Sequence, residues 1–454
     1  MAVQLNAQDF KFLSVNITSS RGGSKDITKV VSEYEVYEDI SLPYCTGNIL
    51  VQDQTGWIES MKLMGTERLT VTIQVNTSSP TVSGPTFTKN WIINGIERAV
   101  KTGDGDGKSE GYVFKLVDEH AMASKAKKFS KSIGKGNLLE VEIISILANE
   151  LGKNVKPEFS GSSQRQWKAI IPYMHPLEAA DWLRARASTN TGLPFLLYAT
   201  LYSDNLTLAS LDILQQKPPF NGTGPSSAFV YAGANVQYEE YKEAYPGRFR
   251  QIKDFKAVDM CDSFRQIMSG TCGAAYAMTE LDEAIIQGWV PKHYSILEVL
   301  GSIPKDGQQN VYDEAFSMAG VGPAHANDAR IIHQVLNKQT FQPDANYKSI
   351  QWEADVDSHK NKIKTLSCLT MMERNTYEVR LSGRDIAGTK QGVGSRINVQ
   401  IPDNAIEEGK GSDKLKSGYF LITKSKNVFK QDGGAGLHEA TLNISKFNEG
   451  PGEL

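Results

Sequence analysis

Apolar and polar residues alternate strictly in two stretches that lie near opposite ends of the chain. In the first, from Leu69 to Val75, every second residue is apolar, and threonine or glutamine occupies the positions between. The second, from Ile397 to Ile401, repeats the pattern with Asn398 and Gln400 as its polar members. Successive side chains of a β-strand point to opposite faces, so this alternation predicts strands that are buried on one side.

One shift of 328 positions, from 69 to 397, relates these stretches and also aligns the blocks around them. It carries Trp91–Ile93 onto Tyr419–Leu421, Val100 onto Val428, Phe114 and Leu116 onto Leu442 and Ile444, and Asp104–Gly107 onto Asp432–Ala435. The last blocks are rich in glycine and aspartate between strands, which predicts a tight hairpin turn in both places. A single match between amphipathic strands can arise by chance, but blocks that share one register indicate a duplicated β-domain.

The residues between the two copies predict a different kind of structure. Residues 1–120 read as nearly all β, with strands at Asn48–Asp53, Leu69–Val75, Trp91–Val100 and Tyr112–Val117. A helix is then predicted at Asn137–Leu151, capped by Asn137 and ended by Gly152, with an apolar face of Leu138, Val141, Ile144, Leu147 and Leu151.

A second helix is predicted to begin at Pro176, because proline suits the first turn of a helix. A hairpin follows, from Pro194–Tyr202 to Leu206–Leu211, with its turn at Asp204 and Asn205. Residues 126–228 therefore predict a compact α/β unit with its own core, inserted between β segments. The stretch Lys217–Ser227, rich in proline, glycine and serine, is interpreted as the linker that leaves it.

The region from 229 to 340 has a weaker pattern. It indicates strands near Phe229–Val236, Gln251–Phe255 and Ala274–Leu281, and short helices near Ser295–Ile303 and Ala326–Leu336. A polar helix is predicted at Lys348–Leu369, before the second β copy at about 376–446. The fold class is thus α+β and β-rich, with two duplicated β-barrel domains (1–125 and 341–454), an inserted small α/β domain (126–228) and a connecting α/β region (229–340) that completes the barrels.

Composition narrows the function classes. The 454 residues are 40% hydrophobic and 22% charged, which is ordinary for a globular protein, and the net charge of −3 argues against a protein dedicated to nucleic acid. No apolar run approaches the roughly 20 residues of a membrane helix, and the first residues do not resemble a secretory signal. The four widely spaced cysteines (Cys45, Cys261, Cys272 and Cys368) predict reduced thiols in a protein that folds in the cytoplasm.

Candidate chemistry is sparse. Gly103–Ser109 ends like a phosphate-binding loop, but Thr102 stands where that motif needs glycine, and no helix is predicted to follow. The segment therefore reads as a hairpin turn, and it also lacks the ligand spacing of a calcium loop. His325, Asp328 and His333 could meet around a metal ion only if the chain brought them together, so ordinary histidines are the preferred interpretation.

Other reactive side chains give no firmer signal. Cys272, in the glycine-containing segment 268–273, has no base partner that the sequence can identify, so we interpret this segment as a turn. Carboxylates are plentiful (Glu239, Glu240, Asp355, Asp357, Glu407 and Glu408), but nothing selects a glycosidase pair. Five lysines between 125 and 135 surround one aromatic residue, Phe129, which favours a solvated connector over a nucleic-acid platform. We expect no catalytic, cofactor-binding or metal-binding residues, and hence no enzyme.

Two segments resemble a known family. The inserted α/β domain of that family is similar to three stretches of this chain: Ile170–Tyr173, the helix at Pro176–Ala187, and Leu193–Tyr198. Ser395–Pro402, Ser417–Lys424 and the strand near His438–Ile444 are similar to its second barrel. The family is that of the baseplate hub proteins of contractile-tailed bacteriophages, which are related to the base of type VI secretion spike proteins. The resemblance covers most of residues 1–450 as an order of features, although no single motif is diagnostic.

The resemblance implies a fold and a role. Two barrels like the tail-tube subunit, in each of three chains, give six tube-like units around one axis. Such a homotrimer would join the six-fold tail tube to a three-fold central spike, contact other baseplate (wedge) proteins, and let DNA pass through its channel without specific binding. We expect a virion component, assembled in the host cytoplasm and not inserted in a membrane. Because nothing follows residue 454 in this sequence, the spike is expected to be a separate polypeptide.

Three alternatives stay open at this point. The chain could be the hub of another phage-like injection machine or of a type VI secretion system. It could be a tail-associated cell-wall hydrolase or peptidase, which predicts a carboxylate or Cys/His site within 126–228. It could also bind a receptor or glycan, which predicts exposed aromatic platforms. The tryptophans (Trp57, Trp91, Trp167, Trp182, Trp289 and Trp352) instead lie mostly within predicted strands or helices.

Overall fold

The computed structural model describes residues 9–76, 83–102, 109–133, 138–159, 167–189, 193–231, 250–260, 275–280, 292–295, 331–336, 348–349, 369, 372, 375–401, 416–432 and 435–446. Strands dominate these residues, and most belong to a single 13-stranded sheet with the order β2-β1-β5-β6-β7-β4-β3-β21-β20-β13-β14-β19-β22. The β-rich class predicted from the sequence is therefore confirmed.

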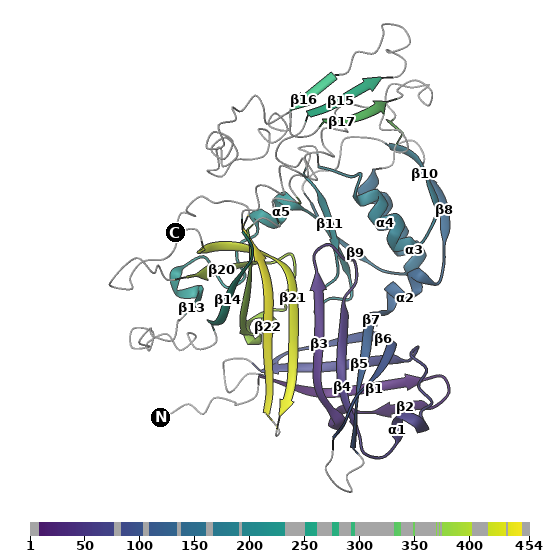
Figure 1. Cartoon of the computed structure of the whole chain (residues 1–454), viewed down its shortest axis with the longest axis vertical. Coiled ribbons are helices and arrows are strands. Elements are labelled where there is room, and N and C mark those ends of the chain that lie inside the picture. Colours follow the sequence, from purple (N-terminus) through teal and green to yellow (C-terminus); the bar gives the residue numbers. More distant parts are fainter. Residues whose placement is uncertain are drawn as a thin grey trace.

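The first part of this sheet, called here the first module, contains the strands up to β7 and one short helix after β4 (purple and blue in Figure 1). Their bounds are β1 Phe10–Ser19, β2 Gly23–Asp26, β3 Val31–Asp39, β4 Thr46–Asp53, α1 Trp57–Ser60, β5 Arg68–Asn76, β6 Ser83–Thr102 and β7 Ser109–Asp118. The strands from β1 to β3 are joined in antiparallel pairs, and their inward residues, such as Trp91 and Phe114, are fully buried.

The second module contains the later strands of the large sheet (Figure 1). Their bounds are β13 Phe229–Tyr231, β14 Gln251–Met260, β19 Asn375–Ser382, α11 Arg384–Gly388, β20 Arg396–Gln400, β21 Gly418–Asp432 and β22 Ala435–Ser445. Pairing of β21 with β22 closes the strands β20-β13-β14-β19-β22-β21 into a ring. Its inward side chains, including Phe420, Val379 and Leu442, form a core of their own.

The order β4-α1-β5-β6-β7 recurs in the second module as β19-α11-β20-β21-β22. The shift of 328 that aligns the sequence blocks carries Asn48 to 376 in β19, Trp57 to 385 in α11 and Leu69 to 397 in β20. The modules differ at one pairing, because β1 runs antiparallel to β5 whereas β13 runs parallel to β20. The first module, unlike the second, shows no closing pair between its outer strands among the described residues.

An α/β unit lies beside both modules (Figure 1). It comprises α2 Glu119–Lys125, β8 Phe129–Ile133, α3 Leu139–Leu151, β9 Val155–Glu158, β10 Trp167–Met174, α4 Pro176–Arg184, β11 Phe195–Tyr198, β12 Leu206–Ser210 and α5 Leu211–Gln216. The predicted start of α4 at Pro176 agrees with the structure, and β11 and β12 form the predicted antiparallel hairpin. β9 extends this hairpin into a three-stranded sheet, and β10 pairs with β8.

The helix α3 differs from its prediction at one end and on one face. It ends at Gly152, which adopts the left-handed conformation (φ 62°), as expected for a C-cap glycine. Its N-cap is Leu138 rather than Asn137, and Val141 is 53% exposed whereas Ile143 and Leu147 are buried. The helix is apolar on more than one side, so spacing alone did not identify the side that packs against the protein.

The core of the α/β unit continues into the cores of the two modules. All four residues of β11 are buried, because Phe195 and Leu197 join the first module's core while Leu196 and Tyr198 join that of the second. A strand covered on both faces is apolar throughout, as β11 is. It therefore acts as a wedge between the modules.

The remaining strands form smaller groups. β15 Ala275–Glu280 pairs with β16 Lys292–Ser295 and with β17 Ile331–Leu336, while β18 Lys348–Ser349 pairs with β10. The predicted helix at Ala326–Leu336 is therefore wrong over β17, where β-branched residues pair in parallel with β15. Lys348 and Ser349, the first residues of the predicted helix Lys348–Leu369, also form a strand, and most of the rest of that helix lies outside the described residues. Residues 296–303 of the helix predicted at Ser295–Ile303 lie outside them as well.

Candidate functional site: the junction of the modules and its outer face

The strands β3 and β21 join the two modules edge to edge. They pair in an antiparallel ladder that runs from Lys424 opposite Asp39 to Lys430 opposite Glu33. Beyond β3 the sheet continues into β4, and beyond β21 into β22, so one uninterrupted face crosses from module to module (Figure 1). A surface shared by both modules is the natural candidate for a functional surface in a chain with sparse chemistry.

The outward side chains at this joint form three ion pairs, called here the charge ladder. The lysine ammonium groups of Lys424, Lys426 and Lys430 lie 3.3, 2.7 and 3.5 Å from the carboxylates of Asp39, Glu35 and Glu33 respectively. The lysines are 39 to 60% exposed, so the ladder faces solvent in the single chain. Exposed pairs of this kind contribute little to stability, typically below about 1 kcal/mol each.

Glu35 of the charge ladder accepts several hydrogen bonds. Burial acts to raise its pKa, but hydrogen bonds from Lys426, Tyr37 and Asn48 outweigh burial, and its pKa lies below the ordinary value. The pKa of Lys426 is raised, since its contacts with Glu35 outweigh the opposing effect of burial. Both groups are therefore ionised near neutral pH.

Paired charges continue on either side of the ladder. Lys115 on β7 pairs with Glu97 on β6, and Lys253 on β14 lies 2.6 Å from Glu439 on β22. Lys115 and Lys253 thus also meet carboxylates at close range. Around the joint, the outer face consequently presents paired charges of both signs rather than a basic or acidic stripe.

Behind the ladder, the modules share an aromatic core. Phe429 points inward from β21 and contacts the rings of Phe10, Tyr34 and Phe87, all of the first module, at centroid distances of 5.2, 5.7 and 6.2 Å. It also stacks on His438 at 4.0 Å. Because Phe429 belongs to the second module but lies in the first module's core, the two modules cannot separate without exposing it.

Asp9 fastens the start of β1 to the second module. Its carboxylate lies 2.7 Å from the guanidinium of Arg384 and accepts a hydrogen bond from the backbone N–H of His438 at 3.1 Å. Its own backbone N–H donates to the carbonyl of Gly436 at 2.7 Å. Arg384 is only 3% exposed, so this ion pair is well shielded from water.

Glu38 lies on the inward side of β3, where both modules and the α/β unit meet. Its carboxylate accepts hydrogen bonds from the backbone N–H groups of Leu201, in the α/β unit, and of Val393, at 3.4 Å in the second module. Burial raises its pKa to about 7, despite these bonds and the positive charge of Lys89. One carboxylate therefore connects three parts of the fold.

The loop at 392–394 needs glycine to approach this junction. A Cβ on Gly392 would come within 2.7 Å of the Glu38 carboxylate. Gly394 has a φ of +79°, and a Cβ there would lie 2.2 Å from the hydroxyl oxygen of Tyr198 on β11. Larger residues at either position would push the second module away from the wedge strand.

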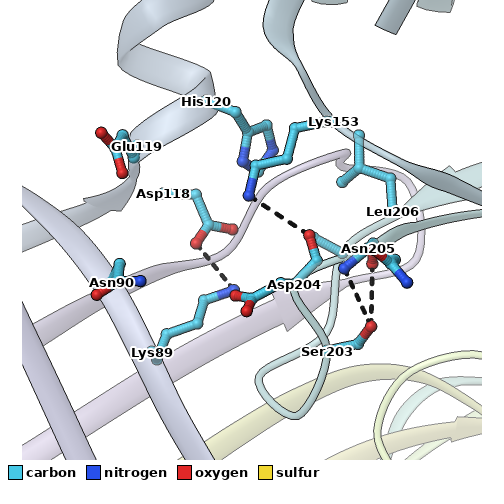
Figure 2. A pocket seen from close by; sticks show the side chains of 11 residues that line it. Lys89, Asn90, Asp118, Glu119, His120, Lys153, Ser203, Asp204, Asn205 and Leu206 are labelled. Atoms are coloured by element: carbon cyan, nitrogen blue, oxygen red, sulfur yellow. Dashed lines mark hydrogen bonds and ion pairs between the residues drawn. The ribbon is translucent and has the colours of Figure 1, made fainter. Parts of the chain in front are cut away.

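A buried ion pair supports the junction from the first module. Lys89 lies 2.9 Å from Asp118, both side chains being about 5% exposed, and also donates to the carbonyl of Thr200. Asp118 accepts a hydrogen bond from the N–H of Cys45 at 2.7 Å. This pair lines a pocket of about 170 Å³ between β6, the end of β7 and the 203–206 turn. Figure 2 shows the side chains around it.

The pocket walls are mainly polar. Lys153 donates to the carbonyl of Asp204 at 3.4 Å (Figure 2). The ring of His120 hydrogen-bonds the carbonyl of Pro43 at 2.7 Å through Nε2. Burial lowers the pKa of His120 below its ordinary value, so the ring is neutral near pH 7. Each of these side chains therefore has a hydrogen-bond partner, which is typical of a structural polar cluster.

Sequence analysis missed Glu38, Lys89 and Asp118, although a signal was present. Each stands on the inward parity of its strand, after apolar residues such as Tyr34 and Val36, or Phe114 and Leu116. A charge placed in the apolar register of a strand must be buried and paired.

The structure shows which strands surround the weak motifs of the sequence. Thr102 pairs with Ser109 across the Gly103–Ser109 segment, so two antiparallel strands flank it, as the hairpin interpretation requires. Asp432 and Ala435 pair in the same way. Gly103–Lys108 themselves, Cys272, His325 and Asp328 lie outside the described residues.

The lysine-rich stretch is not a plain connector, because Phe129–Ile133 forms β8. Three of its lysines are also paired with carboxylates: Lys125 with Glu178, Lys127 with Glu150 at 3.2 Å, and Lys131 with Glu142 at 2.7 Å. The stretch therefore offers little free positive charge for nucleic acid.

Within the residues that the structure describes, no group of three or more histidine, cysteine, aspartate or glutamate side chains is arranged to hold a metal ion. Among the same residues, no helix has the length and apolar character needed to cross a lipid bilayer.

The chain is similar to known proteins in its fold rather than in its sequence. No protein-family model matches the chain, and no curated protein matches it. The tail protein from Neisseria meningitidis MC58 is similar with a TM-score of 0.52 and 12% sequence identity, over 96% of this chain and 96% of that one. The chain thus has the fold of a tail protein along nearly its whole length.

Two further solved structures are similar at lower scores. The 43 kDa tail protein of prophage MuSo2 from Shewanella oneidensis gives a TM-score of 0.48 at 9% identity, over 96% of this chain and 99% of that one. The Escherichia coli c3393 protein, described as a type VI secretion component similar to T4 tail proteins, gives 0.41 at 10% identity, over 97% and 77%. The resemblance to tail hub proteins drawn from the sequence is confirmed at the level of the fold.

Proposed function

We propose that this protein is the structural baseplate hub of a contractile phage tail. Three copies would form a ring with six related β modules, two from each chain. One side of the ring would bind the hexameric tail tube, the other a trimeric central spike, and the outer rim would meet the wedge proteins of the baseplate. The protein would act through binding and geometry, as a virion component without catalytic residues or cofactors.

The observation that carries the proposal is the repeated order β4-α1-β5-β6-β7 and β19-α11-β20-β21-β22 at one constant shift in sequence. Two modules of equivalent construction let a three-fold assembly imitate six-fold packing, which resolves the mismatch between tube and spike. Rings of this kind arise from heterologous interfaces whose rotation closes.

The way in which the modules meet supports the same role. They join edge to edge through β3 and β21, and Phe429, Asp9 and Glu38 fix their relative orientation. A fixed angle between modules is what a ring component requires, because an error in that angle would prevent closure. A flexible pair of domains would serve binding but not ring geometry.

The charge ladder suits a channel wall. Basic grooves hold DNA because lysines displace the counterions of its phosphates. On the face shared by the modules each ladder lysine is already matched by a carboxylate, so little counterion release is available. If this face lines the channel, DNA would slide past it. The hub of a related injection or type VI secretion machine is the alternative, since it would use the same ring with a different cargo.

The proposal is tested by native mass spectrometry and by electron microscopy of end-on particles. Three chains of 50.0 kDa should give a complex of about 150 kDa, seen as a six-lobed ring with a central channel. The same preparation should release no products from purified peptidoglycan. A stable monomer that degrades peptidoglycan would overturn the proposal in favour of a tail-associated hydrolase.

A further inference from the structure

Among the residues that the structure describes, two strand edges have no neighbouring strand. β14 pairs with β19 from Ile252 to Met260, but β13 reaches only its first two residues. β6 pairs with β5 only as far as Ile92, and from Asn94 to Thr102 its one strand partner among the described residues is β7. Unpaired edges present rows of backbone donors and acceptors that favour pairing with another strand.

The chain itself contains a template for filling these edges. β21 passes beyond its short partner β20, and its second half pairs with β3 of the first module. β6 passes beyond β5 in the same manner, and the shift of 328 places its Thr102 on Lys430. The free half of β6 is thus the first module's counterpart of the half of β21 that holds β3.

β14 is correspondingly the counterpart of β3. Glu33 of β3 lies opposite Leu50, and Lys256 of β14 lies opposite Glu378, which is 328 positions after Leu50. One edge of β3 is taken by β4 and the other by β21, whereas β14 has β19 on one edge and no strand on the other beyond Ile252 among the described residues.

We propose that β14 of one chain pairs antiparallel with the second half of β6 of the next chain, repeating between chains the contact of β3 with β21 within a chain. This rests on the proposed trimeric hub. The register follows from the template: Glu33 lies opposite Lys430, so Lys256 lies opposite Thr102 of the neighbouring chain. Three such contacts alternate with three internal ones, and the sheet wall closes.

Three exposed apolar residues lie on β14 or at a position equivalent to the internal junction. Ala257 lies opposite Tyr377, and Tyr34 lies opposite Ile49, which is 328 positions before Tyr377, so Ala257 is the counterpart of Tyr34. Ala257 is exposed, whereas Tyr34 is fully buried. Val258 beside it is 50% exposed. Met64, 63% exposed, is the counterpart of Gly392, which lies against Glu38 at the internal junction. Burial of these residues would stabilise the contact through the hydrophobic effect.

Cysteine cross-linking tests the register. Directly opposed residues of an antiparallel pair have Cα atoms about 4.5–5.5 Å apart, within the span of a disulfide. Mild oxidation of the Thr102→Cys/Lys256→Cys variant should therefore give covalent dimers and trimers on a non-reducing gel. The Thr102→Cys/Lys253→Cys variant moves one cysteine three residues along the strand, roughly 10 Å, and should not react. Each single variant alone should also give no cross-link, which excludes the native cysteines.

A second pair of variants avoids dependence on disulfide chemistry. Val258→Lys should raise the concentration at which half of the trimer dissociates by tenfold or more, because it places a charge in the proposed contact. Val141→Lys, at a position of matched exposure (53%) on α3, should leave that concentration unchanged. Mass photometry over a dilution series measures both.

The outcomes separate this inference from the function it rests on. Trimers that cross-link at 102 and 256 but not at 102 and 253, and that Val258→Lys weakens, support the pairing. Trimers that fail to cross-link at 102 and 256, or that resist Val258→Lys, overturn the pairing and leave the hub standing. Absence of any trimer in the unaltered protein overturns both.

Discussion

Replacing Glu38 with glutamine should change how the stability of the protein depends on pH. Glu38 is 2% exposed at the junction of both modules and the α/β unit, and burial raises its pKa from the ordinary 4.5 to about 7. A raised pKa means that the folded protein binds the proton more tightly than the unfolded chain does. The stabilising contribution of the protonated form is complete below pH 4.5 and is lost as the pH rises through 7.

The magnitude follows from the difference between the two pKa values. One pKa unit corresponds to 1.36 kcal/mol, so the change from 4.5 to about 7 corresponds to roughly 3 kcal/mol. Glutamine keeps the shape but cannot ionise. The free energy of unfolding of Glu38→Gln minus that of the wild type should therefore increase by roughly 3 kcal/mol between pH 4.5 and pH 8.

Other groups titrate in this range, and the difference between variants removes them. Burial lowers the pKa of His438 to about 3 and also lowers that of His120, so both rings resist protonation and weaken the fold as the pH falls below 6.5. Their effect opposes that of Glu38 in the wild type. It cancels in the difference, since the histidines are unchanged in the variant.

Urea unfolding at a fixed protein concentration, followed by tryptophan fluorescence at half-unit pH steps, measures the effect. Glu35→Gln is the matched control on the same strand. The pKa of Glu35 is lowered, so its contribution is complete above its ordinary pKa of 4.5 and is lost only in more acidic solution; its difference curve should therefore stay flat from pH 4.5 to pH 8. A Glu38→Gln curve that is flat from pH 4.5 to 8 would show that this carboxylate is not held in the buried junction described above.

Two further predictions concern the joint between the modules. Phe429→Ala should lower the free energy of unfolding by about 3–5 kcal/mol and expose the joint to protease. Phe420→Ala, an equally buried change inside the second module's own core, should lower it as much without selective cleavage at the joint. Limited proteolysis with mass spectrometry distinguishes the two outcomes. Changing the three acidic residues of the charge ladder to lysine should make the protein retain double-stranded DNA on a filter at 50 mM salt, and retention should fall steeply by 200 mM. Changing the three ladder lysines to glutamate breaks the same pairs and should give no retention; equal retention by both variants would contradict the neutral-wall argument.

Local signals in the sequence sufficed for much of the sheet. Alternation located β5, β7 and β20, and the residues of the Gly/Asp turns separated the strands that the structure pairs. The end of α3 followed from Gly152, because a left-handed C-cap is a property of one residue. These features depend on neighbours in sequence, so a sequence can reveal them.

Features that depend on distant partners were not predictable in the same way. The segment Ile331–Leu336 has a pattern compatible with helix or strand, and its parallel partner β15 decides for strand. The buried side of α3 is chosen by what covers it, which leaves Val141 exposed. Ion pairing of Lys131 with Glu142 required the fold to bring β8 and α3 together.

The internal and proposed external contacts between modules differ in a way that bears on assembly. The internal contact combines strand pairing with the Asp9 ion pair, the Phe429 ring and the β11 wedge, all supplied by one chain. The proposed contact at β14 has a free edge, with Ala257 and Val258 exposed, and the chain holds it open. Fusion of two modules would therefore fix half of the ring's joints during folding. In the proposed ring only the other half would remain to form between chains, and the angle of the internal joint would then decide how many chains close it.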